Sequence, residues 1–123
     1  MTDARTYGGT VDQAVEAVVG AAVVEAQQQA EVLAGSAHAG RALPTGLVGR
    51  SDLINLHLQA RAGLDVGREV ALLRRQGVTW AQIGAATGMA RQSAHERWSE
   101  TVAMILDRYG TGELAERAEP DPA

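Results

Sequence analysis

The stretch GVTWAQIGAATGMARQSAHERW, residues 77–98, decides the fold expected for this chain. Thr79 is followed three residues later by Gln82, and this spacing fits a capping box, in which each side chain accepts a hydrogen bond from the other residue's backbone N–H. A helix should therefore begin at Thr79. It is expected to run to about Thr87, because Gly88 readily takes the left-handed backbone conformation that ends a helix.

A second helix is expected from about Ala90 to about Arg108. Apolar residues recur along it at three- and four-residue spacing and predict one buried stripe: Ala94, Trp98, Val102, Ile105 and Tyr109. Trp80, Ile83 and Ala86 should form the buried side of the preceding helix. Two helices joined by a short turn with glycine are typical of a helix-turn-helix unit, whose second helix enters the DNA major groove. No β-rich segment follows, so we expect a unit without a wing.

The segment IGAATGMARQSAHERW also resembles a known family. It is similar to the pattern IGxALGVSRQ(A/S)AxxR(W/F) of small helix-turn-helix DNA-binding proteins of high-GC Gram-positive bacteria, which are akin to region four of sigma factors. The resemblance covers about residues 65–100 and implies a tri-helical DNA-binding unit in which Arg91, Gln92 and His95 face the bases. The sequence departs from the pattern at Ala90, where the family usually has a Ser or Thr cap, a loss worth about 1 kcal/mol.

The residue chemistry at the start of this helix suits major-groove recognition. Arg binds the O6 and N7 atoms of guanine with two donors, and Gln binds N6 and N7 of adenine. Arg91 and Gln92 are therefore the predicted base-reading pair, with His95 one turn further on. Contacts to the DNA backbone are predicted for Thr79, Gln82, Arg97, Arg74, Arg75 and Ser93. For each of these side chains the alternative is an ordinary solvated residue.

Two further side chains of this segment leave alternatives open. Glu96 could read the N4 amine of cytosine, repel a phosphate or pair with Arg97. Trp80 and Trp98 lie on the expected buried stripes and are interpreted as core residues, not as base-stacking residues.

The distribution of charge favours a nucleic-acid partner although the total does not. The chain carries 11 basic and 15 acidic residues, a net charge of −4. Residues 50–98 hold seven arginines against four acidic residues, a net charge of +3, whereas residues 1–49 carry −3 and residues 99–123 carry −4. Because phosphate neutralisation supplies much of the affinity for DNA, the positive segment that contains the motif is the expected contact surface.

Composition limits the number of domains and the class of protein that this chain can form. A chain of 123 residues is one domain's worth, and the absence of Cys excludes disulfides and thiolate metal sites. The longest apolar run, residues 17–24, is far shorter than the ~20 residues that span a bilayer, and no secretion signal is recognisable. We therefore expect a soluble cytoplasmic protein. All the basic residues are Arg, which suggests a GC-rich bacterial genome.

The N-terminal region should form one long helix. Residues 1–9 lack periodicity and are expected to be mobile. Thr10 and Gln13 have capping-box spacing, so a helix is predicted from Val11 to about Ala34, ended by Gly35.

The middle of this helix is apolar on nearly every side: Val15, Val18, Val19, Ala22 and Val23. Such a helix is normally buried on every side, and in a short chain a second subunit is the expected cover. Residues 10–49 are thus predicted to mediate dimerisation. One alternative is that the helix roofs the DNA-binding unit within a monomer, and another is that VVGAAVV forms a strand.

Residues 35–49 read as a linker, and His38 within it as a solvated loop residue. Ser51 is expected to cap the next helix, which Gly63 and Asp65 interrupt. Beyond them Val66, Val70 and Leu73 form a stripe that ends at Gly77. The sequence leaves open whether residues 52–76 form one bent helix or two. Arg68, Arg74 and Arg75 fall off the stripe, so they should face solvent, either as phosphate contacts or as ordinary surface.

The remaining features point away from catalysis. Residues 110–123 are rich in Gly, Glu and Pro and are predicted to be a disordered acidic tail, which leaves residues 50–109 as the DNA-binding domain. No nucleophile elbow, phosphate loop or metal-ligand cluster occurs, so no enzyme, metal or cofactor is expected. The sequence predicts an all-α, homodimeric regulator of transcription that recognises an inverted repeat in double-stranded DNA. The alternative is an adaptor module of sigma-like, partition or transposition type that binds free DNA weakly.

Overall fold

The computed structural model describes residues 9–36, 42–107 and 121. Within these ranges the chain is all-helical and contains no β-strand, which confirms the predicted all-α class. The elements in chain order are α1 (Gly9–Ala34), a 3-10 turn η3 (Thr45–Leu47), α2 (Ser51–Arg61), α3 (Gly67–Arg75), α4 (Trp80–Thr87) and α5 (Arg91–Asp107).

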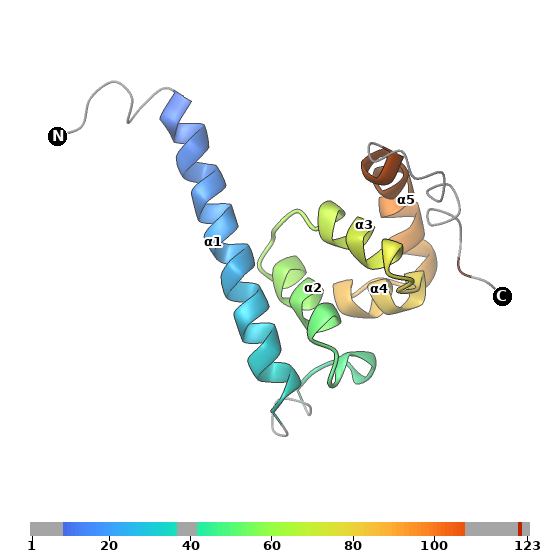
Figure 1. Cartoon of the computed structure of the whole chain (residues 1–123). Coiled ribbons are helices and arrows are strands. Elements are labelled where there is room, and N and C mark those ends of the chain that lie inside the picture. The colour runs from blue at the N-terminus through green and yellow to red at the C-terminus, as the bar shows by residue number, and fades with distance from the viewer. Residues whose placement is uncertain (1–8, 37–41, 108–120, 122–123) are drawn as a thin grey trace.

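The helices form a compact group with one long arm (Figure 1). α1 packs against α2, α2 packs against α4, and both α3 and α4 pack against α5. The N-terminal half of α1 extends away from this group (Figure 1). The core is formed by η3 and the four helices α2 to α5. Its largest fully buried apolar side chains are Trp80, Leu47, Leu53, Ile54, Leu56, Ile83, Val70 and Val102.

The segment around Gly63 separates two helices, which answers the question that the sequence left open. α2 ends at Arg61, and Gly63 has a φ of 80°, in the left-handed region that favours glycine. The Asp65 carboxylate then accepts a hydrogen bond at 3.0 Å from the backbone N–H of Gly67, the first residue of α3, while the capping position itself belongs to Val66. The stripe of Val66, Val70 and Leu73 is buried, as predicted.

The predicted cap at Ser51 is wrong. Ser51 is the first residue of α2, and the capping position belongs to Arg50, whose side chain makes no capping hydrogen bond. Instead the Asp52 carboxylate accepts a bond from the N–H of Leu53 at 2.8 Å and two from the Arg50 guanidinium, at 3.1 and 2.8 Å. These bonds lower the pKa of Asp52 below its ordinary value of 3.8, and hydrogen bonding by Arg50 has the largest effect.

The predicted linker contributes to the core in the part that the structure describes. Leu47 in η3 is fully buried, and η3 packs against both α2 and α4. Within α2, His57 Nδ1 lies 2.9 Å from the Ala86 carbonyl oxygen and joins α2 to the end of α4. His38 lies outside the described residues.

The long N-terminal helix differs from its prediction at its start. It begins at Gly9, so Thr10 lies inside the first turn and not at the capping position. Its apolar middle is not covered within a single chain, since Val15 is 56% exposed and Val18 is 69% exposed, while Ala30 is buried. The segment VVGAAVV is helical throughout. Over the described residues, no helix combines the length and apolar character needed to cross a bilayer.

Candidate nucleic-acid interface

The start of α4 is held by the capping box that the sequence predicts. Thr79 Oγ1 accepts a hydrogen bond from the N–H of Gln82 at 3.1 Å, and Gln82 Oε1 accepts one from the N–H of Thr79 at 3.0 Å. Thr79 is the capping residue, and α4 begins at Trp80. Thr79 and Gln82 were both predicted to contact the DNA backbone, and the side-chain oxygens of both are engaged in this cap.

The turn between α4 and α5 is tight. Gly88 has a φ of 77°, and the N–H of Met89 donates to the Gly84 carbonyl at 2.8 Å. A Cβ atom on Gly84 would lie 2.5 Å from the Met89 carbonyl oxygen, which is closer than such atoms approach in proteins. Gly84 therefore permits α4 to lie against the turn that leads into α5. Its role was missed from the sequence, where the available signal was a glycine inside a short predicted helix.

α5 has a buried side and an exposed polar side. Ala94, Trp98, Val102 and Leu106 are buried, whereas Ile105 is half-buried. The predicted stripe is therefore correct over its first three residues and continues through Leu106; Tyr109 lies outside the described residues. The leading turn exposes three of the predicted DNA-contacting residues, Arg91, Gln92 and Ser93.

Gln92 already has a partner on the exposed side of α5. Its Nε2 donates to Glu96 Oε1 at 3.1 Å, one helical turn further on. Of the roles left open for Glu96, the structure favours pairing, with Gln92 as the partner instead of Arg97. The carboxamide of Gln92 would have to leave Glu96 in order to bind an adenine with both of its polar atoms.

The three predicted base-reading residues lie close together. Arg91, Gln92 and His95 line one hollow of about 190 Å³, together with Trp80 and Asp121. His95 is half-buried, and its ring meets the Trp80 ring edge-on at a centroid distance of 5.4 Å. α4 thus fixes the position of His95 beside the leading turn of α5.

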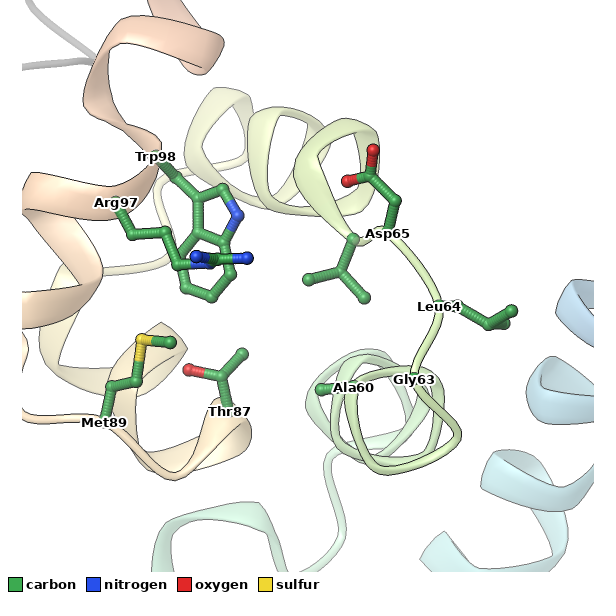
Figure 2. A pocket seen from close by; sticks show the side chains of 9 residues that line it. Ala60, Gly63, Leu64, Asp65, Thr87, Met89, Arg97 and Trp98 are labelled. Carbon is green, nitrogen blue, oxygen red and sulfur yellow. The ribbon is translucent and has the colours of Figure 1, made fainter.

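Arg97 lines a different pocket, between the end of α2 and the middle of α5 (Figure 2). The pocket has a volume of about 460 Å³, and Asp65, Thr87 and Met89 also line it. The Arg97 guanidinium carbon lies 5.5 Å from the centre of the Trp98 ring. Arg97 is exposed, so its side chain is accessible for the predicted contact with the DNA backbone. It does not line the hollow that Arg91 lines.

The predicted solvent exposure of Arg74 is wrong. Arg74 is only 6% exposed, and its Nη1 donates to the Val78 carbonyl oxygen at 2.8 Å. Its guanidinium carbon lies 4.8 Å from the centre of the Trp80 ring. The last turn of α3 faces α4, so Arg74 extends over Trp80 instead of into water. Arg75 is exposed as predicted, and Arg68 is exposed beside the groove between α1 and α3.

Asp121 is the described residue of the acidic tail, and it lies against the start of α4. Its Oδ1 accepts a hydrogen bond from the N–H of Trp80 at 2.6 Å, and its Oδ2 accepts one from the N–H of Ala81 at 2.9 Å. Arg74 Nη1 lies 3.4 Å from Oδ1. Nothing in the local sequence singles out this carboxylate among those of the tail, so sequence analysis missed it.

Comparisons with protein-family models, with curated proteins and with solved structures find no match to this chain. The resemblance of residues 65–100 to small helix-turn-helix proteins therefore rests on the sequence motif. Among the residues with described positions, no cluster of three His, Asp or Glu side chains is arranged to hold a metal ion.

Proposed function

We propose that this protein binds double-stranded DNA sequence-specifically through a helix-turn-helix unit formed by α3, α4 and α5, and that it regulates transcription. The observation that carries the proposal is the leading turn of α5. It exposes Arg91 and Gln92 side by side, while Ala94 and Trp98 are buried and hold the helix against its neighbours. A rigid helix with a polar leading end suits insertion into a major groove.

The roles of the individual residues follow from their positions. Arg91 would bind a guanine with two hydrogen bonds, and Gln92 an adenine once it has left Glu96. His95 would add a contact at the edge of the same hollow. Exposed Ser93, Arg75 and Arg97 would contact phosphates, and the net charge of +3 over residues 50–98 supports this surface as the one facing DNA.

A homodimer formed through α1 belongs to the same proposal. Six residues recur along α1 at three- and four-residue spacing: Val15, Val19, Ala22, Ala26, Ala30 and Leu33. α2 packs against α1, and Ala30 of the stripe is buried, but Val15 and Val19 line the groove between α1 and α3 and are 56% and 43% exposed. A second copy of α1 would bury the open part of the stripe.

The dimer predicts the form of the DNA site. Two copies related by a twofold axis would each place an α5 helix in a major groove on one side of the duplex. The site would then be an inverted repeat with half-sites about 10 bp apart, or a multiple of that spacing.

Selection from a pool of random duplexes, followed by gel shifts at several salt concentrations, tests the proposal. Arg91→Ala should weaken binding to the selected site by about 1 to 3 kcal/mol and relax one base position. Arg68→Ala removes the same charge from a side chain beside the groove between α1 and α3, and should leave that base preference unchanged. Equal weakening by Arg91→Ala on all duplexes would refute a base-reading role for Arg91.

A second candidate is an adaptor whose partner is another protein. The observation that favours it is the same open apolar surface of α1, together with the bond that engages the Gln92 carboxamide. An adaptor would bind free duplexes weakly at all sequences, and substitutions at Val15 would disrupt complexes with a different protein instead of a dimer. The gel shifts and the oligomeric state of the pure protein distinguish the two candidates.

A further inference from the structure

The start of α4 forms an anion-binding site that the chain fills with its own carboxylate. The two carboxylate oxygens of Asp121 accept hydrogen bonds from the backbone N–H groups of Trp80 and Ala81, at 2.6 and 2.9 Å. Its side chain is 6% exposed. These two N–H groups belong to the first turn of α4 and have no partner within the helix, and the helix dipole places partial positive charge beside them.

A second group of different origin points at the same site. Arg74 comes from α3 and is almost fully buried, and its Nη1 lies 3.4 Å from the Asp121 Oδ1 atom. The Val78 carbonyl and the Trp80 ring fix the guanidinium in place from two sides. A buried cation and two backbone donors therefore converge on one pair of oxygen atoms.

The donors match a phosphodiester as well as they match a carboxylate. Both groups present two oxygen atoms that share one negative charge, and helix starts bind either of them. The site also adjoins the proposed base-reading surface, since Asp121 lines the same hollow as Arg91, Gln92 and His95. A DNA strand along the leading turn of α5 would bring a phosphate close to the position that Asp121 holds.

We propose that the start of α4 and Arg74 form a binding site for a DNA backbone phosphate, and that Asp121 occupies this site and competes with DNA. This inference rests on the function proposed above and adds self-inhibition to it. The competing carboxylate is part of the same molecule, so it reduces the fraction of protein that is open to DNA, and the apparent affinity falls by that fraction.

The first test compares two variants that each remove one negative charge from the acidic tail. Asp121→Asn should bind duplex DNA more tightly than the wild type by roughly fivefold or more. Glu116→Gln makes the same change of charge at another position of the acidic tail, and should produce a much smaller gain. Equal gains in the two variants would mean that only the net charge of the tail matters, and would overturn the competition.

The second test follows the site itself, without DNA. Inorganic phosphate is titrated into the wild type and Asp121→Asn, and the backbone N–H signals of Trp80 and Ala81 are followed by NMR. In Asp121→Asn these signals should shift at a lower phosphate concentration than in the wild type. The other backbone amide signals of the variant serve as the control that it is folded. If the phosphate concentration needed is the same in both proteins, the competition by Asp121 is refuted. If phosphate does not shift the Trp80 and Ala81 signals of Asp121→Asn, the anion site is refuted.

The two tests separate this inference from the proposed function. One outcome is that phosphate shifts the Trp80 and Ala81 signals of Asp121→Asn while neither the wild type nor the variant binds duplexes. That result would support the anion site and refute DNA as its ligand. If the wild type and Asp121→Asn bind a selected duplex equally tightly, the proposed function survives and the competition by Asp121 is refuted.

Discussion

α5 and α1 expose surfaces of opposite character. α5 buries its apolar stripe against α3 and α4 and leaves Arg91, Gln92 and Ser93 outside. α1 buries only part of its stripe, and leaves valines such as Val15 and Val18 more than half exposed. This difference is the basis for proposing two kinds of partner. The polar end of α5 suits a polyanion, and the apolar part of α1 suits another apolar helix.

The largest effect expected comes from Gly84→Ala, which tests how closely α4 approaches the turn before α5. The new Cβ atom would lie 2.5 Å from the Met89 carbonyl oxygen, so either the turn or α4 must move. We expect the free energy of unfolding to fall by about 3 kcal/mol. Denaturant unfolding followed by circular dichroism measures it.

Gly20→Ala is the matched control in α1, where a Cβ atom at Gly20 would meet nothing within 4 Å. It should stabilise the protein slightly, by up to about 1 kcal/mol, because alanine favours a helix. A loss of stability as large as that of Gly84→Ala would show that α1 is packed more tightly than the single chain indicates.

The next effect concerns the apolar surface of α1. Val15→Glu places a charge on the open part of the stripe, and should weaken self-association by about 2 kcal/mol, or roughly thirtyfold. Val24→Glu is the control, since Val24 is 51% exposed but lies nine residues on, on the opposite side of the helix. Sedimentation equilibrium measures both. A wild type that stays monomeric at high concentration would contradict the dimer.

A smaller effect distinguishes the starts of α4 and α2. Thr79→Ala removes half of a capping box and should cost about 1 kcal/mol of unfolding free energy. Ser51→Ala should change it by at most a few tenths of a kcal/mol, because Ser51 makes no capping bond. Thermal unfolding of the two variants compares them directly. Equal losses would show that Ser51 caps α2 in solution.

The smallest effect is the pH dependence of the Arg50 and Asp52 pair. The pKa of Asp52 is lowered in the folded chain, mainly by the hydrogen bond from Arg50, so its contribution to stability is present above the ordinary pKa of 3.8 and disappears as the pH falls through the lower folded value. Both side chains are partly exposed, so we expect only a few tenths of a kcal/mol. The difference in unfolding free energy between wild type and Asp52→Asn, measured from pH ~6 to ~3, should shrink toward low pH. A difference that stays constant would contradict this.

Local features of the sequence predicted much of the fold. The spacing of Thr79 and Gln82, the glycine at position 88 and the stripe of Ala94, Trp98 and Val102 gave the bounds and the buried side of α4 and α5. Patterns of this kind act within one helix or one turn, so the neighbouring residues are enough to read them. The same local reasoning was wrong at Ser51, because Asp52, engaged by Arg50, bonds the first turn of α2 instead.

The sequence by itself therefore determined the helical class and the polar residues at the start of α5. It also indicated that the chain could break between α2 and α3. Only the tertiary structure decided that Arg74 is buried over Trp80, that Gly84 lies against the Met89 carbonyl and that Asp121 reaches the start of α4. The physical reason is distance along the chain. These features depend on how one helix lies against another segment, and Asp121 bonds a residue 41 positions before it, which no local pattern records.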